Sequence, residues 1–165
     1  MDSPEPRPAA LSRTTLAVLT EPGHANAYGL VHGGVILRLA DECGAVAALR
    51  HASGTQITTA ALDAMTFLAP VHVGERIEVT AEVTHVGRTS IETRIEVFAE
   101  PLNRPERRRV AVGYGLYVAL DASGKPRPVP PLPIETEADR RREEAALARQ
   151  AVRLARRQEA RETDS

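Results

Sequence analysis

The fold is decided by the stretch Asn26-Ala-Tyr-Gly-Leu-Val-His-Gly-Gly-Val-Ile-Leu-Arg-Leu-Ala-Asp-Glu-Cys-Gly-Ala-Val-Ala-Ala-Leu-Arg50. After its glycine pair, nearly every residue is apolar except Arg38, Asp41 and Glu42. An apolar run of this length predicts one central, buried helix over residues 34–50. A buried helix rarely tolerates an unpaired carboxylate without a chemical reason, so Asp41 is the first candidate functional residue.

The start of this predicted helix supplies further candidates. Its glycine pair leaves the first N–H groups free to face an oxygen of a bound ligand. Asp41 follows Gly34 by almost two helical turns, so both project from nearly the same side. Asn26, these amides and Asp41 are therefore expected to converge on one substrate. Periodicity alone also allows a solvated polar stripe, in which Arg38 pairs with Glu42 and Asp41 has no chemical role.

Apolar and polar residues alternate on either side of the helix, as they do in half-buried β-strands. The expected strands cover residues 14–20, 56–68, 76–86, 90–99 and 109–120. In the middle pair the alternation gives one apolar face and one polar face. The order of one strand, one helix and four antiparallel strands predicts an α+β architecture, with a curved sheet of about five strands wrapped round one long helix.

Small residues share one face of the last predicted strand, at Ala111, Gly113 and Gly115. They leave room for a neighbour to pack very close to the backbone. The central helix is the expected neighbour.

Composition divides the chain into four parts. Residues 1–12 are polar and proline-rich and predict a disordered lead, followed by a folded domain over residues 13–122. Residues 123–134 form a proline-rich linker. Residues 135–165 carry eight arginines and eight acidic residues, which predicts a charged helical tail. The apolar positions in this tail are too few for a stable coiled coil.

Charge and cysteine content exclude several classes of function. A formal net charge of −1 and the absence of tryptophan argue against binding to nucleic acid or to an acidic membrane. Cys43 is the single cysteine, which excludes an internal disulfide and a cysteine-based zinc site. The first residues lack the blocks of a signal peptide. We expect a cytoplasmic, unanchored protein without a metal or a cofactor.

The quoted stretch resembles the cytosolic acyl-CoA hydrolases of the hotdog fold, the brain-type acyl-CoA thioesterases and their bacterial relatives. The similarity continues through Ala-Leu-Asp-Ala-Met-Thr-Phe at residues 61–67, through residues 70–74 and 86–90, and into the charged tail. It covers roughly residues 14–158. The resemblance implies a hotdog fold, dimers of hotdog units and a hexamer made of three such dimers.

The resemblance also implies hydrolysis of fatty acyl-CoA to free fatty acid and coenzyme A. Asn26 and Asp41 stand where the family has its catalytic pair, contributed by opposite hotdog units. We expect Asp41 to act as general base on water, or as nucleophile through a mixed anhydride, while Asn26 orients the water or the carbonyl. The N–H of Gly34 or Val35 is expected to stabilise the oxyanion.

The turn at residues 87–90 resembles the family segment that contacts coenzyme A. Cationic and amide-rich turns bind phosphates, so Arg88, Thr89 and Ser90 are the predicted coenzyme A ligands. The arginines near residues 104–109 fit a solvated loop equally well as a contact from a neighbouring subunit.

The sequence also suggests roles for two further residues and two alternative activities. His32 is expected to be a structural hydrogen-bonding residue, and Asp63 a satisfied polar residue of a strand. A non-catalytic acyl-CoA sensor with this fold would be expected to lack Asn26 or Asp41. An enoyl-thioester hydratase of this fold would be expected to have an aspartate followed five residues later by a histidine. The residue five positions after Asp41 is Val46, which argues against this activity.

Overall fold

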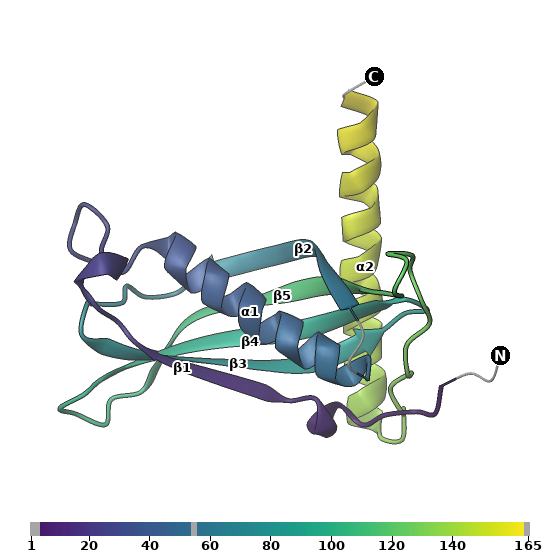
Figure 1. The fold of residues 1–165 in the computed structure, drawn as a ribbon, viewed down its shortest axis with the longest axis horizontal. Helices are drawn as coiled ribbons and strands as arrows, with labels where there is room; N and C mark the ends of the chain where they lie inside the picture. The colour runs from purple at the N-terminus through teal and green to yellow at the C-terminus, as the bar shows by residue number, and fades with distance from the viewer. Residues whose placement is uncertain (1–3, 54–55, 164–165) are drawn as a thin grey trace. The chain divides into compact units, whose positions relative to one another are not determined.

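The computed structural model describes residues 4–53 and 56–163, in two compact units that divide after Leu132. The first unit contains a central helix and five strands (Figure 1), which confirms the predicted α+β architecture. In chain order the elements are η1 (Ala9–Leu11), β1 (Thr14–Leu19), η2 (Pro22–His24), α1 (Gly33–His51), β2 (Gln56–Phe67), β3 (Glu75–Val86), β4 (Ser90–Pro101), β5 (Arg108–Leu120) and, in the second unit, α2 (Glu137–Thr163).

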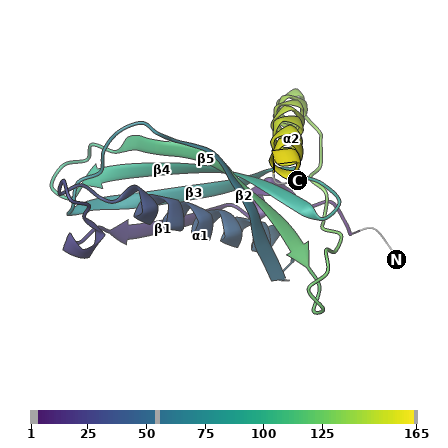
Figure 2. The same ribbon diagram turned by 90° about the horizontal axis from the view of Figure 1, so that it is seen from above.

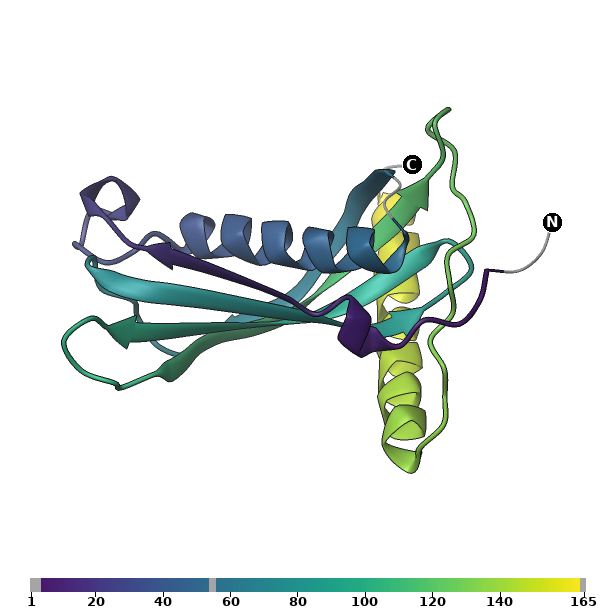
Figure 3. The same cartoon turned by 60° about the horizontal axis from the view of Figure 1, so that its bottom comes forward.

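The five strands form one antiparallel sheet in the order β1-β3-β4-β5-β2. The hairpins β3–β4 and β4–β5 therefore make the centre, while β1 and β2 form the two edges. Helix α1 lies lengthwise against one face of this sheet, as the views in Figures 2 and 3 show.

Helix α1 meets the sheet through small and branched apolar side chains at helical spacing. Ile36, Leu39, Ala40, Cys43 and Ala47 are buried and belong to one core cluster with inward-facing residues of β3 and β4. Burying a large aliphatic side chain contributes roughly 1.5–3 kcal/mol. Alanine and cysteine at the centre of the helix let its backbone approach the strands closely.

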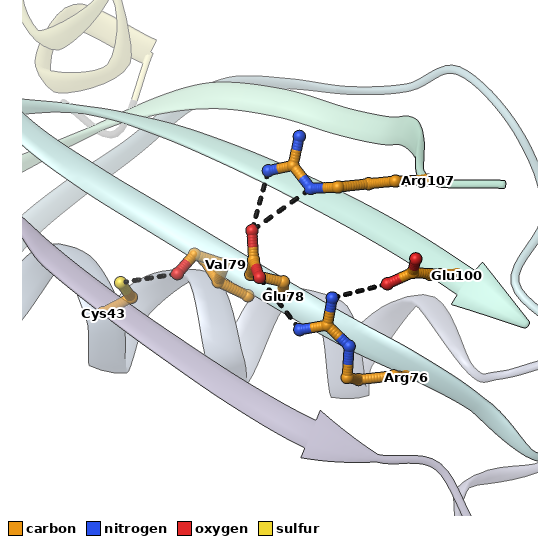
Figure 4. A network of polar contacts seen from close by, with 6 residues as sticks. All are labelled: Cys43, Arg76, Glu78, Val79, Glu100 and Arg107. Atoms are coloured by element: carbon orange, nitrogen blue, oxygen red, sulfur yellow. Dashed lines mark hydrogen bonds and ion pairs between the residues drawn. The ribbon is translucent and has the colours of Figure 1, made fainter. Parts of the chain in front are cut away.

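Cys43 is fully buried within this interface. Its Sγ lies 3.4 Å from the carbonyl oxygen of Val79 on β3 (Figure 4). Burial raises the pKa of the thiol to about 11. Cys43 is therefore a core side chain that stays protonated at neutral pH.

The opposite face of the sheet carries charged side chains, as the alternation predicts. Figure 4 shows Glu78 between two guanidinium groups, at 2.8 Å from Arg76 and 2.7 Å from Arg107. Arg76 also pairs with Glu100 at 2.6 Å. The hydrogen bond from Arg76, followed by that from Arg107, lowers the pKa of Glu78. These pairs are partly exposed, so each contributes modestly to stability.

The arginines of the loop near residues 104–109 also have partners within the chain. Arg107 lies over the ring of Phe98, 3.4 Å from its centroid, in addition to its pair with Glu78. Arg108 binds Glu75 at 2.7 Å, and Arg109 binds Glu96 at 3.0 Å. Whether this loop is solvated or contacts a neighbouring subunit, Arg107, Arg108 and Arg109 are already paired with carboxylates of their own chain.

The space at the glycines of β5 is not filled by the helix backbone, so that part of the sequence prediction is wrong. A Cβ on Gly113 would lie 3.0 Å from Cα of Met65 on β2. A Cβ on Gly115 would collide with the ring of Tyr117, with Cε2 only 2.6 Å away. The ring of Tyr117 therefore occupies the space beside Gly115, and it is fully buried.

The segments predicted as a disordered lead and a linker both pack on the first unit where the structure describes them. Arg7 donates to the carbonyl oxygens of Arg50 and His51, at 2.5 and 3.2 Å, and so satisfies the free end of α1. Arg127 donates to the carbonyl of Ala52 at 2.5 Å. His51, fully buried, lies 2.9 Å from the carbonyl of Pro130 through its Nε2. The first compact unit consequently extends to Leu132 rather than ending at residue 122.

The second unit is a charged helix, as predicted. Thr136 and Asp139 form its capping box, because the Asp139 carboxylate accepts from the Thr136 N–H at 2.9 Å and Thr136 Oγ1 accepts from the Asp139 N–H at 3.1 Å. Glu137 pairs with Arg141 one turn later at 3.5 Å. Neither of the two α-helices in the described residues has the length and apolar character needed to cross a membrane.

Candidate active site

Asp41 lies on the side of α1 that faces β2 and β5 and is partly buried. Its Oδ1 accepts a hydrogen bond from Thr59 Oγ1 of β2 at 3.0 Å. The hydroxyl of Tyr117 on β5 lies 3.2 Å from the Asp41 carbonyl oxygen and 3.4 Å from Oδ1. One carboxylate oxygen is thus held by neighbouring strands, while Oδ2 has no hydrogen-bond partner among the described residues.

The polar-stripe explanation accounts for the neighbours of Asp41 but not for Asp41 itself. Arg38 and Glu42 form the predicted pair one turn apart, at 2.9 Å. Asp41 makes its contacts with the strands instead, and no ion pair to it occurs within residues 4–53 and 56–163. Its carboxylate is therefore available for chemistry.

Asn26 lies in the loop before α1, where its side chain shapes the backbone. Its Oδ1 accepts the N–H groups of Tyr28 and Leu30, at 2.9 and 3.1 Å. Gly29 between them has a φ of 76°, a conformation that favours glycine. Because the oxygen is already engaged, the group that Asn26 can offer to a ligand is its Nδ2 donor.

A mostly apolar pocket of about 380 Å³ opens beside Asn26 at the start of α1. Gly33 forms part of its wall, and a Cβ there would lie 3.5 Å from the Phe67 ring. Ten residues line the pocket: Asn26, Leu30, Val31, Gly33, Ile36, Phe67, Leu68, Ala69, Pro70 and Val71. The pocket combines apolar walls with one amide donor, a combination that suits an acyl group carrying a carbonyl.

The two amides expected to bind an oxyanion both have partners within the chain. The Gly34 N–H donates to Nδ1 of His32 at 2.8 Å, and the Val35 N–H donates to the His32 carbonyl at 2.9 Å. His32 is thus the N-cap of α1, the structural role expected for it. Its side chain is exposed, so a rotation of the ring would free the Gly34 amide.

The predicted coenzyme A turn lies at the other end of the sheet from Asn26. Arg88 and Thr89 lie in the turn between β3 and β4, and Ser90 begins β4. The Arg88 carbonyl accepts from the Val129 N–H at 3.2 Å. The loop of Asn26 instead reaches the start of β3, through a bridge between Leu30 and His72. Within the described residues of one chain, no hydrogen bond joins Asn26 to Asp41, and Arg88 is remote from Asn26.

Sequence reasoning missed Thr59 and Tyr117. A usable signal existed for Tyr117, because it shares the inward face of β5 with Gly113 and Gly115, and a buried tyrosine hydroxyl needs a partner. Thr59 gave no such signal, since it is one of two consecutive threonines on an exposed edge strand. No cluster of three or more histidine, cysteine or acidic side chains suited to a metal ion occurs in the described part of the chain.

Comparison with known proteins places these features in a family. The pattern of the thioesterase superfamily matches residues 28–106. The solved structure of a hexameric acyl-CoA thioesterase is 36% identical, covers 92% of this chain and 97% of that chain, and superimposes with a TM-score of 0.85. This chain belongs to the thioesterase superfamily. The expected hotdog fold is thereby confirmed.

Mammalian members of the superfamily are longer than this one. The cytosolic acyl coenzyme A thioester hydrolase of Mus musculus is 36% identical over 158 residues, which cover 94% of this chain and 41% of the mouse protein. The chain thus spans about two fifths of the length of that relative.

A bacterial member of the superfamily has been solved with ligands. The acyl-CoA hydrolase of Staphylococcus aureus, in complex with butyryl coenzyme A, coenzyme A and coenzyme A disulfide, is 29% identical, covers 95% of each chain and has a TM-score of 0.85. Alanine variants of one asparagine and one aspartate of that protein have also been solved, and the two positions are fifteen residues apart. Asn26 and Asp41 have the same separation. A third variant replaces a threonine seventeen residues after that aspartate, and Thr58 and Thr59 follow Asp41 by seventeen and eighteen residues.

Proposed function

We propose that this protein hydrolyses the thioester bond of acyl-CoA, releasing a carboxylic acid and coenzyme A. The observation that carries the proposal is the Asp41 carboxylate, which is partly buried, held through one oxygen by Thr59 and Tyr117, and not neutralised by a cation among the described residues. The matching separation of Asn26 and Asp41 from the substituted pair of the Staphylococcus aureus hydrolase supports the same assignment.

The complete site requires two subunits. Asn26 and Asp41 do not meet within one chain, so we infer that Asn26 of one subunit and Asp41 of another flank the same thioester. The edge strand β2 supports such a dimer, because it has an unpaired edge and carries half-exposed apolar side chains at Leu62 and Phe67. Assembly of three such dimers into a hexamer follows the hexameric relative. The cytosolic designation of the mouse relative supports a cytoplasmic location.

In the proposed reaction Asp41 acts as the general base. Its free Oδ2 takes a proton from a water molecule, and the resulting hydroxide attacks the thioester carbonyl carbon. The Nδ2 group of Asn26 donates to the carbonyl oxygen and stabilises its negative charge, because Oδ1 of Asn26 is already engaged by the backbone. The carbon–sulfur bond then breaks, and the protonated Asp41 returns its proton to the coenzyme A thiolate.

The helix amides contribute only after a local change. The Gly34 N–H can donate to the oxyanion once the His32 ring has turned away, whereas the Val35 N–H stays within the first helical turn. Gly34 is therefore the better candidate of the two. In the alternative mechanism Asp41 itself attacks the carbonyl carbon, expels the thiolate and forms a mixed anhydride that water hydrolyses.

A pair of neighbouring carboxylates tests the role of Asp41. Asp41→Asn is expected to reduce the turnover of acyl-CoA by several powers of ten with little change in binding, whereas Glu42→Gln, one residue away and exposed, is expected to keep wild-type turnover. Thiol release across a panel of acyl chain lengths measures both variants. Near-normal turnover of Asp41→Asn would refute the proposal.

Isotope labelling separates the two mechanisms. When water attacks the Asp41 carbon of the anhydride, repeated turnover in oxygen-18 water places label in the Asp41 carboxylate, whereas general-base catalysis leaves it unlabelled. Mass spectrometry of the peptide that contains Asp41 reads the result.

A further inference from the structure

A buried phenol lies directly beneath the proposed catalytic carboxylate. Tyr117 has no exposed surface, and its hydroxyl is within 3.4 Å of two oxygens of Asp41. We propose that Tyr117 is a positioning residue for Asp41: its hydroxyl and that of Thr59 hold Oδ1, so that Oδ2 is the oxygen presented to the substrate. This inference rests on the proposed function and names a residue that acts through Asp41 without touching substrate.

Two glycines fix the position of the phenol. A Cβ on Gly44 of α1 and a Cβ on Gly115 of β5 would each collide with the Tyr117 hydroxyl oxygen. A Cβ on Gly44 would also lie 2.9 Å from Cδ1 of Ile95 and from Oγ1 of Thr93. The ring therefore lies in a slot between a helix and a strand that both lack side chains at this point. A ring held in this way has little freedom to move its hydroxyl relative to Asp41.

The phenol can serve only as a donor to Asp41. Its acceptors, the Asp41 carbonyl and Oδ1, have no hydrogen to give when the carboxylate is ionised. Burial, followed by the charge of Asp41, raises the pKa of Tyr117 well above its ordinary value. The hydroxyl consequently keeps its proton at neutral pH.

The hydroxyls of Thr59 and Tyr117 donate to the same oxygen of Asp41 from two different strands. Thr59 Oγ1 donates to Oδ1 at 3.0 Å from the exposed edge strand β2, and Tyr117 approaches Oδ1 from the buried side on β5. On α1, the charged neighbours Arg38 and Glu42 pair with each other at 2.9 Å, and Cys43 is a protonated thiol. The polar groups that hold the carboxylate are therefore hydroxyl donors.

Tyr117→Phe tests the assignment, because phenylalanine fills the same slot and removes only the hydroxyl. The measurement is kcat and KM for an acyl-CoA substrate, with the thermal midpoint recorded in parallel. The kcat is expected to fall about tenfold, since the carboxylate loses one of the two hydroxyls that hold Oδ1 in place. KM is expected to stay within about twofold, because the hydroxyl is buried and does not contact substrate.

Tyr114→Phe is the matched control, since Tyr114 lies on the same strand with its side chain on the other face of the sheet. It is expected to keep the wild-type kcat and KM. Thr59→Val removes the other hydroxyl that donates to Oδ1 and is likewise expected to lower kcat. A Tyr117→Phe variant with wild-type kcat and KM would overturn the assignment.

Asp41→Asn, measured alongside, separates this inference from the proposed function. An inactive Asp41→Asn together with a Tyr117→Phe variant of wild-type kcat would overturn only the role of Tyr117. A fully active Asp41→Asn would overturn the proposed function, and the role of Tyr117 with it.

Discussion

Replacing Gly44 by alanine should destabilise the protein even though alanine is the better helix former. In the middle of an exposed helix this change gains about 0.8–1.0 kcal/mol. Here the new Cβ would collide with the Tyr117 hydroxyl and lie 2.9 Å from both Ile95 and Thr93. These neighbours are fully buried, and Tyr117 cannot retreat because Gly115 closes the other side of its slot.

The expected size follows from these two opposing effects. Overpacking a well-packed core costs typically 1–3 kcal/mol, and the rigid surroundings of Gly44 place it in the upper half of that range. After the helix gain is subtracted, the net loss is about 1–2 kcal/mol. Urea unfolding at a fixed protein concentration measures it, with a midpoint expected to fall by roughly 0.5–1 M.

Gly33→Ala is the matched control on the same helix. Its Cβ would meet only the Phe67 ring at 3.5 Å, an ordinary contact, so its unfolding midpoint should equal or exceed that of the wild type. If Gly44→Ala also leaves the midpoint unchanged or raises it, the slot between α1 and β5 does not constrain Tyr117.

Three further predictions concern pH, coenzyme A and assembly. Burial, and then the charge of Arg7, lowers the pKa of His51 below its ordinary 6.5, so its contribution to stability is complete above pH 6.5 and declines as the pH falls below that value; His51→Gln should flatten the dependence of the urea midpoint on pH between 7.5 and 5.5, and an equally steep wild-type and variant slope would contradict this. Arg88→Ala should weaken the affinity for free coenzyme A about tenfold by calorimetry, whereas Arg104→Ala in an exposed loop should not; an unchanged affinity of Arg88→Ala would remove Arg88 from the site. Leu62→Lys on the edge strand β2 should shift the protein toward monomers in size-exclusion chromatography and abolish turnover, whereas Leu102→Lys, 67% exposed in the β4–β5 loop, should do neither; oligomers that survive Leu62→Lys would exclude β2 from the dimer contact.

The periodicity of the sequence predicted the helix and all five strands to within one or two residues at most ends. This accuracy has a local cause, because the apolar run before Arg50 and the alternation in β3 and β4 depend only on which face of each element is buried. The candidate pair Asn26 and Asp41 was also accessible, since an asparagine before a glycine pair and a carboxylate in an apolar helix are both visible in the sequence.

The remaining features depend on contacts between residues far apart in the chain. Tyr117 reaches Asp41 across 76 positions, and Arg7 reaches Arg50 across 43. Neither contact leaves a periodic trace in the sequence, so the inward glycines of β5 were assigned to the wrong neighbour and the lead was expected to be disordered. The partner of the Gly34 amide was missed for a different reason, because the N-cap role of His32 depends on its rotamer.

The buried thiol of Cys43 has a practical consequence for every experiment that follows the release of coenzyme A with a sulfhydryl reagent. The only cysteine of the chain is shielded by the core and protonated at assay pH, so the folded enzyme adds no background colour to the measurement. One equivalent of reagent consumed per chain before substrate is added would instead report unfolding. One assay can thus measure both the coenzyme A that is released and the fraction of each variant that is unfolded.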